Sequence, residues 1–234
     1  MTNDRYTASV GFYDLWHEDG HVPEVRAALP ALLSGVRRSV LEIGAGTGLI
    51  TLTIADAVPG EVFALEPSDG MRNVLLSRLA ERRDLLPRVT VLPYGALDLD
   101  LDEQVEAVVM IAVLYHFTPS ERVGLWELLG EKVEPGGLLV FNWRERPPLV
   151  ERPLRLDLSS QVGRHTYEMW SEILDDTTAR WVYRVTQGDR VISETSETGR
   201  GYRVSLEQLR KELNAAGFDQ ADAPEPLYAW RRGK

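Results

Sequence analysis

Three glycines at alternate positions, directly behind a short apolar segment, limit the folds open to this chain more than any other feature. The apolar segment is 39–43, and Gly44, Gly46 and Gly48 follow it. Its β-branched residues predict a strand, and apolar residues at helical spacing over 49–58 predict a helix. Glycine allows a tight turn and leaves no Cβ between main-chain N–H groups and a ligand. The stretch therefore predicts a strand, a ligand-binding turn and a helix.

The order of residues around these glycines separates two kinds of nucleotide-binding turn. A dinucleotide turn has the pattern G-x-G-x-x-G, and its third glycine would fall on Leu49. The chain instead has E-x-G-x-G-x-G, beginning with the acid Glu42. This pattern resembles motif I of the class I S-adenosylmethionine (SAM)-dependent methyltransferases. The resemblance implies a turn that passes beneath the methionine and ribose parts of SAM, with contacts from Glu42, Gly44, Ala45, Gly46 and Gly48.

An acid at the end of the next predicted strand supports nucleoside binding. The segment 61–66 predicts that strand and ends in Glu66, roughly 20 residues beyond the glycines. A carboxylate there can accept hydrogen bonds from both ribose hydroxyls, a contact that SAM and NAD share. The residues that follow resemble the family's segment after this strand, in which a Met often lies against the adenine. The resemblance therefore adds Pro67 and Met71 to the SAM contacts.

Composition excludes several kinds of site and partner. With 234 residues, 44% of them hydrophobic, the chain is long enough for one large core with an added lobe. It has 0 Cys, which excludes disulfides, thiolate metal sites and cysteine nucleophiles. Its 4 His show no metal-ligand spacing, so no metal is expected. The formal net charge of −10 would repel phosphate backbones and disfavours a nucleic-acid partner.

The sequence carries no sign of membrane insertion or secretion. No apolar run approaches the roughly 18 residues that a membrane-spanning helix needs. The start contains Asp4 and Arg5 without an apolar core, so we expect no signal peptide. A cytoplasmic protein without a membrane partner is therefore expected.

Residues 1–36 precede the first predicted strand and begin with an aromatic-rich segment. Apolar residues on one side of 23–33 predict a helix. The pair Tyr13–Asp14 resembles a Tyr-Asp pair near the N-terminus of many small-molecule methyltransferases. The resemblance implies an N-terminal helical lid over the cofactor, with Tyr13 as a contact. The alternative is an amphipathic helix that caps the edge of the sheet.

Apolar strands and helices alternate from residue 37 to residue 143. Such alternation predicts a parallel sheet with helices on both faces, and cofactors bind at the carboxyl ends of such strands. The resemblance implies a Rossmann-like α/β fold whose seven-stranded sheet is mostly parallel, with the last strand antiparallel. The predicted strands are 39–43, 61–66, 88–92, 107–112 and 138–143, and the predicted helices are 48–57, 69–83 and 119–133.

The segment after the third predicted strand departs from the family's pattern. The family usually has an acid there, close to the adenine amino group, whereas this chain has Gly95. Either Asp98 substitutes for that acid, or the backbone of Ala96 and Leu97 alone holds the adenine.

The segment after the fourth predicted strand supplies the candidate catalytic residues. It contains Ala112, Tyr115 and His116 and resembles the family's segment that lines the methyl-transfer site, where a His is common. Imidazole titrates near neutral pH, so His116 is the candidate general base. We expect Tyr115 to face the acceptor and Ala112 to face the cofactor. The alternative for His116 is a buried imidazole that is hydrogen-bonded to the backbone.

Residues 144–203 lie outside the minimal fold of this family. Alternating residues over 180–186 and 190–196 flank a turn at 187–189 and predict a β-hairpin. An appended hairpin resembles the arrangement in amino-sugar N-methyltransferases and related natural-product enzymes. It can roof the substrate pocket or pair the subunits of a homodimer.

The tail, residues 204–234, is expected to complete the core. Ser205 suits the N-cap of a helix over 206–216, and Gly217 suits the position just past its end. The resemblance implies that the final antiparallel strand pair follows. The whole chain is therefore predicted to be one methyltransferase domain, 1–234, with a lid (1–36), a SAM-binding core (37–143), an insert for substrate or dimerisation (144–203) and a core completion (204–234).

The predicted activity is methyl transfer from SAM to a nitrogen or oxygen of a small-molecule acceptor, such as a metabolite or a natural-product intermediate. SAM carries an activated methyl group, so the protein mainly aligns donor and acceptor. A protein or RNA acceptor and a SAM-binding module without catalysis stay open as alternatives. An NAD-dependent reductase is disfavoured by Leu49 and by the lack of a Tyr-x-x-x-Lys pair.

Overall fold

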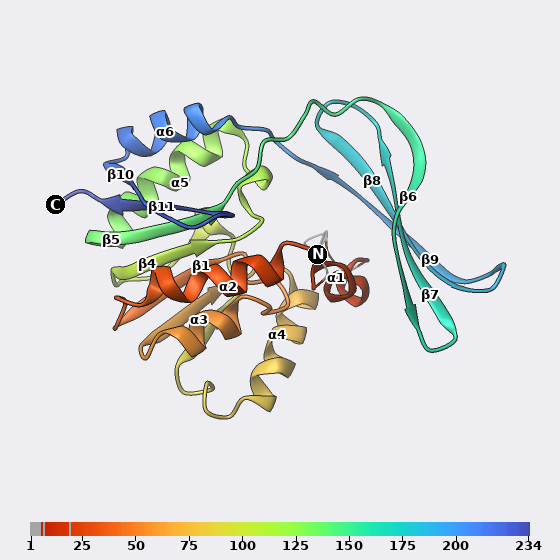
Figure 1. Cartoon of the computed structure of the whole chain (residues 1–234), viewed down its shortest axis with the longest axis horizontal. Helices are drawn as coiled ribbons and strands as arrows, with labels where there is room; N and C mark the ends of the chain where they lie inside the picture. The colour runs from red at the N-terminus through yellow and green to blue at the C-terminus, as the bar shows by residue number, and fades with distance from the viewer. Residues whose placement is uncertain (1–5, 7, 19) are drawn as a thin grey trace.

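The computed structural model describes residues 6, 8–18 and 20–234, which form two lobes (Figure 1). The charged start at Asp4 and Arg5, with the rest of 1–5 and positions 7 and 19 of the predicted lid, lies outside the described residues. The larger lobe contains the parallel sheet and its helices. The smaller lobe is an antiparallel sheet made by the predicted insert.

A seven-stranded sheet forms the centre of the larger lobe. Its strands are β1 (Ser39–Ile43), β2 (Glu61–Leu65), β3 (Val89–Leu92), β4 (Val105–Met110), β5 (Val133–Asn142), β10 (Phe218–Ala221) and β11 (Leu227–Arg232). In space they lie in the order β10-β11-β5-β4-β1-β2-β3. β11 runs antiparallel to both of its neighbours, and the other pairs are parallel. The predicted mostly parallel sheet with an antiparallel last strand is confirmed.

Helices cover both faces of this sheet because its central strands are apolar on both sides. In β1 and β2, Val40 and Val62 face one helix layer, whereas the next residues, Leu41 and Phe63, face the other. The first layer contains α2 (Val22–Leu33), α3 (Thr51–Ala57) and α4 (Asp69–Glu81), and the second contains α5 (Pro119–Lys132) and α6 (Leu206–Ala215).

A buried ion pair joins α5 to α6. The Arg122 and Glu212 side chains are 2% and 6% exposed, and Arg122 Nε lies 2.7 Å from Glu212 Oε2. Trp126 Nε1 donates to the same carboxylate at 3.0 Å. Burial alone would raise the pKa of Glu212, but hydrogen bonds from Arg122, Gln208 and Trp126 outweigh it and lower that pKa. The pair fixes α5, which begins directly behind the candidate catalytic segment.

The insert is a four-stranded antiparallel sheet rather than a single hairpin. Its strands are β6 (Arg152–Val162), β7 (His165–Ile173), β8 (Thr178–Gln187) and β9 (Arg190–Arg200), and they lie in this order. The predicted hairpin corresponds to β8 and β9. β6 and β7 were not predicted, because Pro153 and two register shifts in β6 obscure the two-residue alternation.

Helix α1 (Val10–His17) lies between the two lobes (Figure 1). Its buried side chains Phe12 and Trp16 pack on Tyr183 of β8, with ring centroids 5.4 Å and 5.6 Å away. This position suits the predicted lid, which stays a prediction. Within the described part of the chain, every helix is too short or too polar to cross a membrane.

Candidate functional site

The glycine turn after β1 adopts a backbone that other residues rarely take. The φ angle is +75° at Gly44, +56° at Gly46 and +88° at Gly48. A Cβ on Gly44 would lie 2.5 Å from Val113 Cγ2, and one on Gly48 would lie 2.5 Å from Leu75 Cδ1. Glycine is therefore needed for the backbone angles at all three positions, and for close packing at two of them.

Glu66, the residue after β2, presents its carboxylate beside this turn. Its Oε2 accepts a hydrogen bond from the Gly46 N–H at 2.9 Å, and its Oε1 accepts one from the Ser68 N–H at 2.8 Å. Arg72 Nη1 donates to the Glu66 carbonyl at 2.7 Å. These bonds orient the buried carboxylate, and a carboxylate oxygen oriented in this way can accept further hydrogen bonds from hydroxyl groups.

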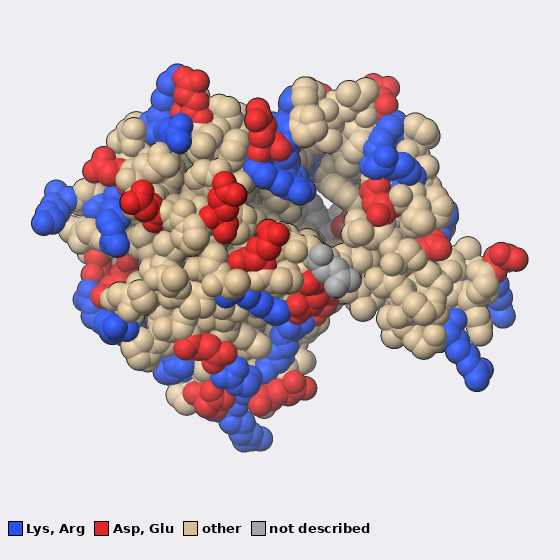
Figure 2. All heavy atoms as spheres, in the orientation of Figure 1, with Lys and Arg blue, Asp and Glu red and all other residues tan. Residues whose placement is uncertain are grey.

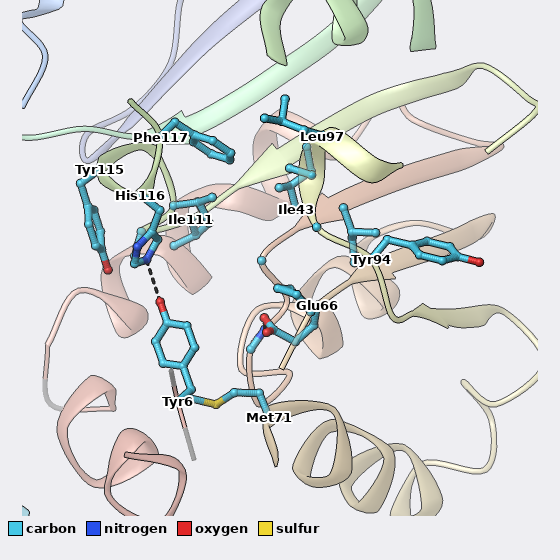
Figure 3. Close-up of a pocket in the computed structure, with 18 of the residues that line it drawn as sticks. Tyr6, Ile43, Glu66, Met71, Tyr94, Leu97, Ile111, Tyr115, His116 and Phe117 are labelled. Carbon is cyan, nitrogen blue, oxygen red and sulfur yellow. Dashed lines mark hydrogen bonds between the residues drawn. The ribbon is translucent and has the colours of Figure 1, made fainter. Parts of the chain in front are cut away.

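A cavity of about 300 Å³ opens where the carboxyl ends of β1 to β4 meet, and we call it the glycine-side cavity. Figure 3 shows Glu66 and Met71 at one end of it and Tyr115 and His116 at another, with Leu97 above Ile43 in this view. Most residues that the sequence singled out line it: Tyr13, Gly44, Gly46, Glu66, Pro67, Met71, Ala96, Leu97, Ala112, Tyr115 and His116.

Three predicted SAM contacts, Glu42, Ala45 and Gly48, lie behind the wall of this cavity. Glu42 is 2% exposed, and its Oε2 accepts a hydrogen bond from Thr51 Oγ1 at 2.5 Å. Burial raises the pKa of Glu42 to about 7. The hydrogen bond from Thr51 lowers this pKa, and the negative charge of Glu66 raises it further. Ala45 is buried, and Gly48 packs on α4. All three therefore support the turn from behind.

Asp14 ties helix α1 to the turn and to α4. Its Oδ1 accepts a hydrogen bond from Thr47 Oγ1 at 2.6 Å, and Thr47 lies between the second and third glycines. The other oxygen of Asp14 forms an ion pair with Arg78 of α4. The position of α1 over the cavity is thus coupled to the turn below it.

Tyr13, next to Asp14, faces the same turn. Its hydroxyl lies 3.7 Å from the position that a Cβ on Gly46 would occupy. Burial, and after it the negative charges of Tyr115 and Glu66, raise the pKa of Tyr13. At neutral pH its phenol is therefore a protonated hydrogen-bond donor and not a base.

The chain after β4 turns sharply and brings Tyr115 and His116 to the cavity. Ala112 has a φ of +59°, and its N–H donates to Asn142 Oδ1 at 2.7 Å. Backbone strain at a non-glycine residue of this kind concentrates at functional sites. The 3₁₀ helix η2 (Leu114–His116) follows, and Tyr6 OH lies 2.8 Å from His116 Nε2, as the dashed line in Figure 3 marks.

The segment after β3 forms another wall of the glycine-side cavity. It contains the 3₁₀ helix η1 (Ala96–Asp98), all of which lines the cavity together with Gly95. A Cβ on Gly95 would lie 3.0 Å from Asp98 Oδ2, so the Asp98 carboxylate lies beside the usual position of the family's acid. Both alternatives for holding an adenine stay predictions, and the residues of each line this wall.

A second cavity, of about 330 Å³, lies between α1 and the insert, and we call it the insert-side cavity. Its wall is aromatic and includes Trp16, Trp181 and Tyr183. Tyr183 OH donates to Glu197 Oε1 at 2.6 Å, and burial together with the nearby Glu197 charge raises the pKa of Tyr183. Among the described lining residues, the cavity thus combines aromatic side chains with the Glu197 carboxylate.

Residues 40–137 match the family model described as a methyltransferase domain. An uncharacterized methyltransferase of Mycobacterium tuberculosis (strain H37Rv) is 28% identical over 141 residues, which cover 60% of this chain and 52% of the relative. The chain thus spans about half the length of the first curated relatives it matches.

Two solved structures share the fold over nearly the whole chain. The CcbJ methyltransferase from Streptomyces caelestis has a TM-score of 0.77 at 21% identity, covering 98% of each chain. SAM-bound CalS10 from Micromonospora echinaspora has a TM-score of 0.69 at 20% identity, covering 95% of this chain and 96% of its own. Residues 40–137 thus match a methyltransferase domain family, and the two solved methyltransferases show that their fold extends over nearly the whole chain.

Two residues that line these cavities were not singled out from the sequence. Tyr6 lines both cavities and contacts His116, which is 110 residues away in the chain. Glu197 lines the insert-side cavity beside Tyr183. Neither has a local spacing that points to a site. For Tyr6, the aromatic-rich start of the chain was the one signal that could have found it.

Proposed function

We propose that this methyltransferase moves a methyl group from SAM to a nitrogen or oxygen of a small molecule, a metabolite or a natural-product intermediate. The observation that carries this proposal is the wall that the two cavities share. Tyr6, Tyr13, Tyr115 and His116 line both the glycine-side and the insert-side cavity. A donor in one and an acceptor in the other would meet at these residues, and alignment is most of what the reaction requires.

The residues that line the glycine-side cavity support a SAM site there. Gly44 and Gly46 keep side chains away from the turn, and Glu66 is oriented to accept hydrogen bonds from ribose hydroxyls. Met71 and Leu97 offer apolar surface to the adenine. When bound, SAM supplies the activated methyl group.

His116 is the proposed general base at the shared wall. A hydroxyl acceptor must lose a proton and an amine acceptor must be neutral, so a base at this place assists both. His116 Nε2 contacts Tyr6 OH at 2.8 Å, which gives a route for a proton directly to the imidazole or through the phenol. Tyr13 does not serve, because its raised pKa keeps it protonated. Tyr115 is proposed to hold the acceptor.

The size and lining of the insert-side cavity favour a ring-shaped acceptor. Aromatic side chains bind ring faces, and a cavity of about 330 Å³ holds a small molecule. CalS10, which shares the fold over nearly its whole length, is described as an amino pentose methyltransferase involved in calicheamicin biosynthesis. This similarity supports an acceptor of natural-product type.

The partner we propose is therefore a small molecule, without a nucleic acid or a membrane. We also propose a homodimer paired through the insert, a cytoplasmic location, and the division of the chain into lid, core, insert and core completion. Light scattering, cell fractionation and limited proteolysis test these three points.

Replacing Glu66 by Ala tests the donor site. Without the carboxylate, the ribose hydroxyls and the Gly46 N–H lose their acceptor, and SAM binding should weaken by about 1–3 kcal/mol in calorimetry. Glu61→Ala, at the exposed start of the same strand, is the matched control and should bind SAM as the wild type does. Equal SAM affinity in the wild type and Glu66→Ala would contradict the assignment. Transfer of labelled methyl to a library of small amines and alcohols then identifies the acceptor.

A further inference from the structure

A third cavity, of about 510 Å³, lies at the neck between the two lobes, and we call it the neck cavity. Four parts of the chain meet there: the α1–α2 connection, the segment after β4, and the two connections between the core and the insert. Its charged and titratable lining includes His17, His21, Arg144, Arg146 and Arg203, with Tyr115 as the wall toward the other cavities.

The two connections are held side by side by hydrogen bonds beside the arginines. Trp143 Nε1, on the outgoing connection, donates to the Val204 carbonyl of the returning one at 3.0 Å. The Tyr202 N–H donates to the Tyr115 carbonyl at 2.7 Å. Arg144 follows Trp143 in the chain, and Arg203 lies between Tyr202 and Val204. These hydrogen bonds therefore fix the backbone on both sides of the cavity beside the two arginines.

The neck cavity holds a surplus of positive charge in an acidic protein. The formal net charge of the chain is −10. Among the described residues that line this cavity, however, three are arginines and one, Glu24, is acidic. None of the three takes part in the ion pairs of the described residues. Figure 2 shows Lys and Arg side chains gathered near the hollow between the lobes.

The cations of this cavity affect one another. Burial is the first cause that lowers the pKa of Arg146 and of His21, and the charge of Arg144 lowers both further. Burial also lowers the pKa of His17 to about 4. At neutral pH both imidazoles are thus uncharged groups that can form hydrogen bonds. A bound anion would reduce the repulsion between the neighbouring arginines.

Arg146 links the neck cavity to the transfer site. Its guanidinium lies over the ring of Tyr115, 4.2 Å from the ring centroid. Tyr115 lines all three cavities, and Arg146 and His17 line both the neck and the insert-side cavity. A group held by Arg146 would therefore lie one side chain away from the place where we propose that the methyl group moves.

We infer that the neck cavity is a binding site for an anionic group, a phosphate or a carboxylate, held by Arg144, Arg146 and Arg203. Guanidinium groups bind these anions through paired, charge-assisted hydrogen bonds. The volume exceeds that of a single phosphate, which suits an anionic part of the acceptor. If the anionic group is part of the acceptor, the inference rests on the proposed function. The methyl-accepting end of that molecule would then lie in the insert-side cavity.

Pyrophosphate binding tests the site without knowledge of the acceptor. Calorimetry should detect sodium pyrophosphate bound to the wild type, and Arg144→Gln or Arg203→Gln should weaken that binding about tenfold or more. Arg164→Gln, at the exposed β6–β7 turn, removes the same charge and should leave binding unchanged. SAM affinity, measured on the same samples, should be equal in all four proteins and shows that the variants are folded. Absent pyrophosphate binding, or equal weakening in Arg164→Gln, would overturn the inference.

A second measurement separates an anion on the acceptor from a free ion. Labelled methyl transfer is compared between glucosamine and glucosamine 6-phosphate, and between serine and phosphoserine. Faster transfer to the phosphorylated member, lost in Arg144→Gln, assigns the anion to the acceptor. Pyrophosphate binding without such a preference assigns the site to a free anion. A protein that binds pyrophosphate but not SAM would refute the proposed function and leave this inference standing.

Discussion

At the scale of single residues, the two glutamates beside the glycine turn differ because their surroundings differ. Glu66 lies at the cavity, and each of its carboxylate oxygens accepts a hydrogen bond from a backbone N–H. Glu42 is fully enclosed, and the donor to its Oε2 is the Thr51 hydroxyl. Burial therefore dominates at Glu42 and raises its pKa to about 7. The first carboxylate suits ligand binding, and the second supports the fold.

Replacing Glu42 by Gln should change how stability depends on pH. The pKa of Glu42 rises from 4.5 to about 7 on folding, so its contribution is complete below pH 4.5 and is lost as pH rises through about 7. Relative to Glu42→Gln, the wild type should lose up to roughly 3 kcal/mol of unfolding free energy over this range. Chemical denaturation at several pH values measures it.

Glu61→Gln is the control for this experiment, since Glu61 is exposed at the start of β2. Its stability curve should run parallel to that of the wild type. Parallel curves for the wild type and Glu42→Gln would show instead that folding does not raise the pKa of Glu42.

At the scale of elements, helix α1 covers the cavities because one side chain fastens it to the core. Asp14 accepts a hydrogen bond from Thr47 in the turn and pairs with Arg78 on α4. The opposite side of α1 packs on β8 through Phe12 and Trp16. The helix is therefore held by a polar contact on the core side and by aromatic packing on the insert side.

Replacing Asp14 by Asn should loosen α1 over the glycine turn. The ion pair with Arg78 is partly exposed, with side chains 31% and 25% accessible, so its loss should cost about 1 kcal/mol or less. SAM should then dissociate several-fold faster in stopped-flow measurements, because the covering helix opens more often. Glu18→Gln, which breaks the nearby pair with Arg26, is the matched control. A SAM off-rate equal to that of the wild type in Asp14→Asn would argue against a lid.

At the scale of the whole molecule, function is proposed to arise where the two lobes meet. The larger lobe supplies the glycine turn, Glu66 and His116, and the insert supplies Trp181, Tyr183 and Glu197. Helix α1 and Tyr115 lie between them, and Tyr115 lines all three cavities. A site of this kind exists only when the lobes are docked.

Replacing Phe12 by Ala should undock α1 from the insert without unfolding the core. Phe12 is 8% exposed and packs on Tyr167 and Tyr183 of the insert. Hydrogen exchange should become about tenfold faster or more in α1 and β8, while β1 and β4 stay protected. Val123→Ala, on an exposed side chain of α5, should leave exchange unchanged. Faster exchange throughout the sheet would mean that the lobes unfold as one unit.

The sequence alone determined the local features of this protein. The glycines of 44–48 need positive φ angles, the acid at Glu66 ends an apolar strand, and the alternation of strands and helices permits few sheets other than the one observed. These features depend on residues that are close together in the chain, so they can be predicted from periodicity and residue type.

Tertiary structure alone decided which distant residues share a wall. Tyr6 meets His116 across 110 residues, and the arginines of the neck cavity come from the two ends of the insert. It also encloses Glu42, a predicted SAM contact, behind the turn, where its carboxylate accepts a hydrogen bond from Thr51. Packing between elements sets these distances, and packing depends on how whole faces fit together rather than on the spacing of residues along the chain.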